Sequence, residues 1–173
     1  MADEVRYAGR FLKMVSRDGW EFTERVGVTG VVGIVAVTEG RKLLLVEQFR
    51  PPVERRVIEL PAGLAGDLAD AADEPLENAV QRELDEETGY QAGHVRFLGE
   101  SPTSAGLTSE TICMFEATGL ERISDGGGDS SESIIVHEIE LARLRTWLAE
   151  QAESGWMVDL KIHAGLAMAG IEY

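Results

Sequence analysis

The segment from Pro75 to Thr88 places acidic and apolar side chains on the same face of a predicted helix. At about 100° per residue, three apolar positions form one stripe, namely Leu76, Val80 and Leu84. Glu83 and Glu87 point in the direction of this stripe, whereas Asp85 lies on the opposite side. Burying carboxylates beside a core is costly unless a cation neutralises them. The helix must therefore pack against a core and hold a positive charge at the same time.

The alternative is a solvated acidic helix, which would place its carboxylates opposite the apolar stripe. Asp85 fits that alternative, but Glu83 and Glu87 do not. Clustered carboxylates offer the hard oxygen ligands that Mg²⁺ and Mn²⁺ prefer. The helix therefore predicts a divalent-metal site, with Mg²⁺ as the cofactor and Mn²⁺ as a substitute.

The composition bounds the class of protein and of partner. The chain has 173 residues, of which 44% are hydrophobic and 27% charged, as in one soluble globular domain. A formal charge of −15 opposes nucleic-acid binding, and no apolar run is long enough to span a membrane. An anionic phosphate compound could bind so acidic a chain only if metal ions reversed the local charge. Because the acidic N-terminus lacks a signal-peptide pattern and Cys113 is the only cysteine, we expect a cytoplasmic protein.

Predicted strands and helices alternate along the chain. Segments 5–15 and 20–26, separated by the turn Arg17-Asp18-Gly19, indicate an N-terminal β-hairpin. Further strands are expected at 28–37, 42–47, 57–60, 95–98, 111–117 and 134–139. Helices are expected at 75–88, about 141–152 and about 159–169, and loops at 61–73 and 124–133. This order favours an α/β fold in which a mixed β-sheet lies between helices, preceded by the hairpin.

The residues of the acidic helix resemble the signature of the Nudix hydrolase family. Glu74 is followed, after seven residues, by Arg82-Glu83-Leu84-Asp85-Glu86-Glu87-Thr88-Gly89-Tyr90, which matches the fixed positions of that signature. The first glycine departs from the pattern, because Leu68 stands where the signature has glycine. Gly63 is the equivalent that we assign, with ten residues between it and Glu74. We interpret the difference as a five-residue insertion in the loop before the helix.

The resemblance implies roles for individual residues. The implied metal ligands are the carboxylates of Glu83, Glu86 and Glu87 and the backbone carbonyl of Ala62. The implied structural positions are Gly63, Glu74, Arg82 and Gly89, with an ion pair between Glu74 and Arg82. The residues themselves favour Asp73 as the N-cap, Pro75 in the first turn and Gly89 as the C-terminal cap.

Segments outside the helix are similar to the branch that contains ADP-ribose pyrophosphatases and nucleotide-sugar hydrolases. These segments are Glu47-Gln48-Phe49-Arg50, 59–63, 101–102, 106–110, 132–136 and 158–161. The resemblance implies Mg²⁺-dependent hydrolysis of a nucleoside diphosphate derivative, with ADP-ribose, cleaved to AMP and ribose 5-phosphate, as the first choice. The alternatives are a nucleotide sugar such as GDP-mannose or ADP-glucose, and a nucleotide-binding module that has lost catalysis. The resemblance also implies a homodimer, with residues 1–26 as a dimerisation element and 27–173 as the hydrolase domain.

The catalytic base stays open among several glutamates. Glu132, at the end of a glycine-rich loop, is the first candidate by resemblance, and Glu110 is the second. Glu86 or Glu83, within the helix, are the remaining alternatives. A solvated loop acid is the alternative reading of Glu132.

Several side chains outside the helix are candidates for binding substrate. Arg50 can clamp phosphates or a sugar through its two-pronged guanidinium, or can form a surface ion pair with Glu54. Trp20 and Phe22 in the hairpin are candidates for stacking on a base, although packing is the more common role of a single aromatic. Glu110 is a candidate for holding the substrate.

Overall fold

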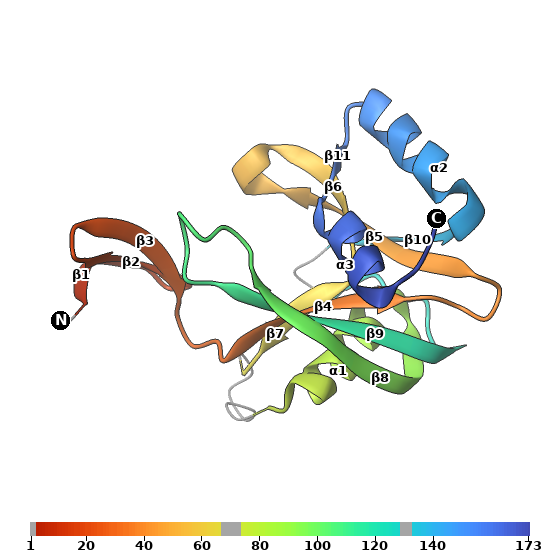
Figure 1. The fold of residues 1–173 in the computed structure, drawn as a ribbon, viewed down its shortest axis with the longest axis horizontal. Helices are drawn as coiled ribbons and strands as arrows, with labels where there is room; N and C mark the ends of the chain where they lie inside the picture. Colours follow the sequence, from red (N-terminus) through yellow and green to blue (C-terminus); the bar gives the residue numbers. More distant parts are fainter. Residues whose placement is uncertain (1–2, 67–73, 129–132) are drawn as a thin grey trace.

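A computed structural model of the chain describes residues 3–66, 74–128 and 133–173 (Figure 1). In chain order the elements are β1 (Glu4–Ala8), β2 (Leu12–Arg17), β3 (Trp20–Arg25), β4 (Gly30–Ala36), β5 (Lys42–Arg50), the 3-10 helix η1 (Pro51–Val53), β6 (Arg55–Glu59), β7 (Ala62–Ala65), α1 (Leu76–Thr88), β8 (Tyr90–Pro102), β9 (Thr111–Arg122), β10 (Ile135–Glu140), α2 (Leu141–Glu153), β11 (Met157–Val158) and α3 (Lys161–Ala169). The predicted α/β class is confirmed.

The mixed β-structure is divided into two four-stranded sheets rather than one. One has the order β7-β4-β9-β8, in which β4 and β9 are parallel. The other has the order β10-β5-β6-β11, in which β6 and β11 are parallel. The remaining neighbours in both sheets are antiparallel. The two sheets share an apolar interior, to which β4 and β5 both contribute.

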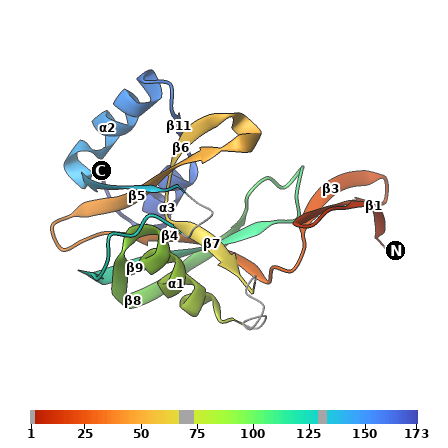
Figure 2. The ribbon, with the colours of Figure 1, turned by 180° about the vertical axis from the view of Figure 1, so that it is seen from behind.

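Strand β4 is buried on both of its faces, which explains the continuous apolar run predicted at 28–37. Val32, Ile34 and Ala36 pack in one cluster with the apolar stripe of α1. Val35, on the opposite face of the strand, packs in a second cluster with residues of α2 and α3. Helices α1 and α3 therefore cover opposite faces of the sheet, as the front and rear views show (Figures 1 and 2).

The N-terminal extension is antiparallel as predicted, but it has three strands rather than two. The segment predicted as one strand at 5–15 reverses direction after β1, where the Gly9 amide donates to the Leu12 carbonyl at 2.8 Å. One glycine without a second turn residue is a weak turn signal, and for this reason the extra strand was not expected. The three strands form a sheet of their own, in the order β1-β2-β3.

Other differences concern the ends of elements. Strands β8 and β9 extend well beyond 95–98 and 111–117, since their antiparallel pairing runs from Tyr90 to Pro102. Strand β7 lies in the segment 61–73 that was expected to be a loop, because pairing with β4 overrides the low strand propensity of glycine and alanine. Pro75 occupies the N-cap of α1 rather than its first turn, and Asp73 lies outside the described residues.

None of the helices in the described part of the chain is both long and apolar enough to cross a membrane.

Candidate active site

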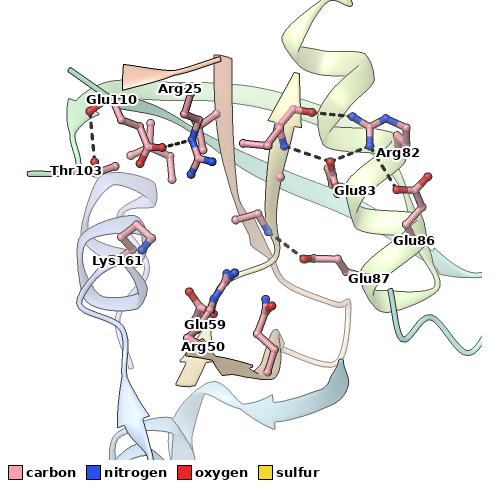
Figure 3. A pocket seen from close by; sticks show the side chains of 16 residues that line it. Arg25, Arg50, Glu59, Arg82, Glu83, Glu86, Glu87, Thr103, Glu110 and Lys161 are labelled. Atoms are coloured by element: carbon pink, nitrogen blue, oxygen red, sulfur yellow. Dashed lines mark hydrogen bonds and ion pairs between the residues drawn. The ribbon is translucent and has the colours of Figure 1, made fainter. Parts of the chain in front are cut away.

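A pocket of about 410 Å³ lies between α1 and α3 (Figure 3). It collects residues that are distant in the sequence, from β3, β4, β5, β6, β7, α1, β9, α3 and the β8–β9 connection. Its lining residues are Arg25, Val31, Gln48, Arg50, Glu59, Ala62, Gly63, Leu64, Arg82, Glu83, Glu86, Glu87, Thr103, Glu110, Ile112 and Lys161. Five of these are glutamates and four are basic, so charged groups of both signs dominate the pocket.

The α1 side of the pocket carries the three glutamates that the sequence singles out. Glu87 is only 3% exposed, and its Oε2 accepts the Ala62 amide at 3.0 Å. The Glu83 side chain is 12% exposed, and its Oε1 accepts the Leu64 amide at 3.2 Å. The Glu86 side chain is 48% exposed. Strand β7 therefore holds the two inner carboxylates through its backbone.

Arg82 connects the acidic helix to the strand and to the start of the helix. Its Nε and Nη2 donate to both carboxylate oxygens of Glu74, at 3.2 and 3.0 Å. The same Nη2 donates to the Leu64 carbonyl at 2.7 Å, and Nη1 donates to Glu83 at 2.8 Å and to Glu86 at 3.3 Å. The guanidinium thus holds the pKa of Glu74 below its usual range. The bracing ion pair implied for Glu74 and Arg82 has this geometry.

Burial raises the pKa of Glu83 to about 7, although the charge of Arg82 partly opposes the rise. The neighbouring charge of Glu86 adds to it. The Arg82 guanidinium alone therefore does not offset the free energy that burial of an ionised Glu83 costs. A further positive charge beside Glu83 would relieve this cost.

Gly63 allows Glu83 to approach the backbone of β7. A Cβ atom at Gly63 would lie 1.9 Å from the carboxylate carbon of Glu83 and 2.1 Å from its Oε1. No other residue fits there without moving the carboxylate. The structural role proposed for Gly63 thus has a steric basis.

The α1 side offers the hard oxygen donors that a divalent cation prefers, and their burial and the raised pKa of Glu83 fit such an ion. Among residues 3–66, 74–128 and 133–173, however, no three His, Cys, Asp or Glu side chains are gathered as a metal-binding group. The oxygens of Glu83 and Glu87 are instead directed at β7 amides. A cation that binds here would have to draw these oxygens together with Glu86.

The opposite side of the pocket carries three basic residues, each held by a carboxylate. Arg25 pairs with Glu110, and Lys161 pairs with Asp159. Arg50 donates to Glu59 at 2.7 Å, and both residues line the pocket.

Strand β3 brings Arg25 to the pocket from the N-terminal sheet. The Thr23 amide donates to the Leu107 carbonyl at 2.9 Å, and the Ser109 amide donates to the Thr23 carbonyl at 3.1 Å. These bonds fix the end of β3 against the β8–β9 connection that carries Glu110. Sequence reasoning did not assign Arg25, because only this long-range pairing places it near the pocket.

Lys161 was also missed, although it was quoted within a segment similar to the family branch. Its position as the first residue of α3 gave no signal that the side chain would face α1 across the pocket. Gln48 and Glu59 were likewise quoted only within such segments, and both line the pocket.

The two aromatic candidates do not line the pocket of their own chain. Trp20 is 62% exposed, and its Nε1 donates to the Gly106 carbonyl at 3.4 Å. The Phe22 ring lies 5.1 Å from the guanidinium carbon of Arg17. Glu132, the first candidate for the base, lies outside the described residues.

In this α/β fold, α1 supplies buried carboxylates to one pocket beside the glycine-containing strand β7. Residues 28–152 match the NUDIX domain, and the chain belongs to this family. The predicted Nudix fold is thereby confirmed.

Relatives of known name support this placement. The chain is 32% identical over 123 residues to a methanol dehydrogenase activator of Bacillus methanolicus, covering 70% of this chain and 64% of that protein. It is 36% identical over 113 residues to an ADP-ribose pyrophosphatase of Bacillus subtilis, covering 65% and 58%. It is 36% identical over 129 residues to a GDP-mannose pyrophosphatase of Salmonella arizonae, covering 70% and 62%. The chain thus spans less than two thirds of the length of these relatives.

A solved structure described as an ADP compounds hydrolase has the same fold. The TM-score is 0.67, the identity is 21%, and the match covers 86% of this chain and 81% of the other.

Proposed function

We propose that this protein hydrolyses the diphosphate linkage of a nucleoside diphosphate derivative, with Mg²⁺ as its cofactor and Mn²⁺ as a substitute. ADP-ribose is the substrate that we favour, with AMP and ribose 5-phosphate as the products. The observation that carries the proposal is the pocket itself, in which an acidic helix faces basic residues. Membership of the NUDIX family and the relatives named ADP-ribose pyrophosphatase support it.

The two sides of the pocket suit the two requirements of a diphosphate. Glu83, Glu86 and Glu87, with the carbonyl of Ala62, would hold the metal ions on the α1 side. When bound, the metal ions would neutralise phosphate charge and lower the pKa of a water molecule. Arg50 would donate hydrogen bonds to phosphate or sugar oxygens from the opposite side. To do so, Arg50 would leave its ion pair with Glu59 and bind the more highly charged phosphate.

The reaction adds one water molecule across the phosphate anhydride. A carboxylate takes a proton from that water, the water oxygen bonds to one phosphorus, and the bridging P–O bond breaks. The departing phosphate retains the bridging oxygen. Glu132 is the base that we propose first, followed by Glu110 and then by Glu86 or Glu83. The ion pair of Glu110 with Arg25 favours a binding role for Glu110.

A nucleotide sugar is the second candidate substrate, because relatives named GDP-mannose pyrophosphatase match 70% of the chain. ADP-ribose, GDP-mannose and ADP-glucose assayed in parallel with Mg²⁺ would rank the candidates by kcat/KM. We expect ADP-ribose to lead. A higher value for GDP-mannose would transfer the proposal to nucleotide sugars, and hydrolysis of none of them would favour a binding module.

The metal assignment is tested by Glu87→Gln, with Asp85→Asn as the matched control. Both positions lie in α1, but Asp85 does not line the pocket. Glu87→Gln should lower turnover by orders of magnitude with the fold intact, whereas Asp85→Asn should keep near-normal turnover. Activity of Glu87→Gln within a few-fold of the wild type would contradict the metal assignment.

A homodimer, a boundary between residues 1–26 and 27–173, and a cytoplasmic location complete the proposal. The N-terminal sheet supports the dimer, because Tyr7, Phe11 and Trp20 expose large apolar surfaces there. Sedimentation of the chain with and without residues 1–26 would test this role. A monomeric full-length chain would refute it.

A further inference from the structure

The glycine-rich segment at 124–128 is docked on the C-terminal end of α1. The Gly127 amide donates to the Glu87 carbonyl and the Gly128 amide donates to the Glu86 carbonyl, both at 2.9 Å. The Ile123 and Ser124 amides donate to the Gly89 carbonyl, at 2.8 and 3.1 Å. The first part of the loop expected at 124–133 is thus hydrogen-bonded to the end of α1.

Helices ordinarily end with four carbonyls that lack partners inside the helix, and their last turns fray. In α1 this last turn contains two of the glutamates of the pocket. The Asp85 carbonyl accepts the Gly89 amide at 2.8 Å, and the next two carbonyls accept the loop amides. The last turn is therefore closed by the loop and not left to solvent.

Only glycine permits this contact. Gly126, Gly127 and Gly128 have φ values of +65°, +112° and +82°, which other residues rarely adopt. A Cβ at Gly126 would lie 2.4 Å from the Thr88 carbonyl carbon and 2.6 Å from the Gly89 nitrogen. A Cβ at Gly89 would lie 2.3 Å from the Ser124 carbonyl oxygen. Gly89 therefore serves both as the cap of α1 and as the surface on which the loop rests.

Glu87 is consequently held through both its backbone and its side chain. Its carbonyl is bonded to Gly127, and its carboxylate is bonded to Ala62. Glu86, whose side chain is half exposed, is held through its backbone carbonyl, which accepts the Gly128 amide. The direction of both side chains therefore depends on the docked glycines.

We propose that Gly126, Gly127 and Gly128 are positioning residues that hold the Glu86 and Glu87 carboxylates in the arrangement that binds the divalent cation. The inference rests on the metal-dependent function proposed above. The glycines do not line the pocket, so they act through the backbone of α1.

The test is Mn²⁺ binding to the substrate-free, full-length protein, measured by electron paramagnetic resonance. The variants are Gly126→Ala and Gly127→Ala. The first collides with α1. Among the described residues, a Cβ at Gly127 would meet only the Ile134 carbonyl oxygen, at 3.9 Å, so this variant strains the loop with little collision. The control is Gly170→Ala, since Gly170 also caps a helix at positive φ (+69°) but has open space around it.

We expect Mn²⁺ to bind about tenfold more weakly to Gly127→Ala, and at least as weakly to Gly126→Ala, because backbone bonds of the last turn are lost. Gly170→Ala should bind Mn²⁺ as the wild type does. In activity assays the Mg²⁺ concentration for half-maximal rate should rise in parallel, while the KM for the nucleotide changes less.

Two results would contradict these expectations. Wild-type Mn²⁺ affinity in both loop variants, with only a lowered melting temperature, would overturn the positioning role. If the wild type and Glu87→Gln bind Mn²⁺ equally, the metal site itself fails, and with it the proposed function. The two failures are thus distinguishable.

Discussion

Removing the Arg82 guanidinium should destabilise the protein more than removing any surface arginine. Its side chain is only 18% exposed, and it donates to two carboxylates that are themselves largely buried, Glu74 and Glu83. In Arg82→Ala these carboxylates lose their shared counter-charge and the Leu64 carbonyl loses a donor. Breaking a buried pair by removing one partner costs about 3–5 kcal/mol. Since a domain is stabilised by about 5–15 kcal/mol, the variant should fold with a markedly lower melting temperature.

The loss should depend on pH and on metal. Without Arg82 the pKa of Glu83 rises further above its present value of about 7, so the folded variant holds a proton more tightly than the unfolded chain. Stability of the variant should therefore fall more steeply than that of the wild type as pH rises toward 8. Saturating Mg²⁺ should reduce the difference, because a bound cation would replace the missing charge.

Urea unfolding at pH 8, with and without Mg²⁺, measures these effects. Arg96→Ala is the control, since Arg96 pairs with Glu116 but is 61% exposed and should contribute less than about 1 kcal/mol. Equal losses in the two variants would refute the reasoning that Arg82 neutralises buried carboxylates. A normal stability with abolished activity would instead assign Arg82 to the substrate.

Three further variants or conditions test the pocket. Gly63→Ala should displace Glu83 and so lower both the melting temperature and the affinity for Mn²⁺, each measured by calorimetry. Gly106→Ala should change neither quantity, because a Cβ at Gly106 would enter open space. The pKa of Glu83 is about 7 in the folded protein and 4.5 in the unfolded reference, so the stability of the metal-free protein should fall as pH rises from about 5 to about 7. Urea unfolding at several pH values should show this fall without Mg²⁺ and not with Mg²⁺. Glu110→Gln should release Arg25 and raise KM severalfold; a collapse of kcat would make Glu110 the base.

The acidic helix could be predicted from the sequence because its determinants are local. Periodicity places Leu84 and Glu87 on one side of the helix, and the structure buries both of them. Glycine is the residue expected at a helix C-terminal cap, and Gly89 occupies that position with a positive φ. Asp85, which periodicity places on the far side, does not line the pocket. Helical periodicity thus sets which side of α1 each residue occupies, whereas β7 and the 124–128 segment hold the carboxylates in place.

Strand ends were less predictable, because pairing rather than local propensity decides them. The Gly- and Ala-containing strand β7 exists since β4 offers it a partner. His94 and Arg96 in β8 are exposed and polar and give no signal for a buried strand, yet they pair with Thr118 and Glu116 of β9. A single sequence contains no direct record of such pairs.

The basic side of the pocket depends on the same long-range order, and so does the choice of substrate. Arg25 reaches the pocket through the β3 contact with Leu107, and Lys161 reaches it because α3 packs against the opposite face from α1. Neither position has a local pattern that marks it as functional. In the proposed reaction the helix would determine which bond is hydrolysed, since the diphosphate would have to meet its carboxylates. The group beyond that bond would meet Arg25 of β3, Arg50 of β5 and Lys161 of α3, so we expect a change in the β3 contact to alter specificity while the helix stays unchanged.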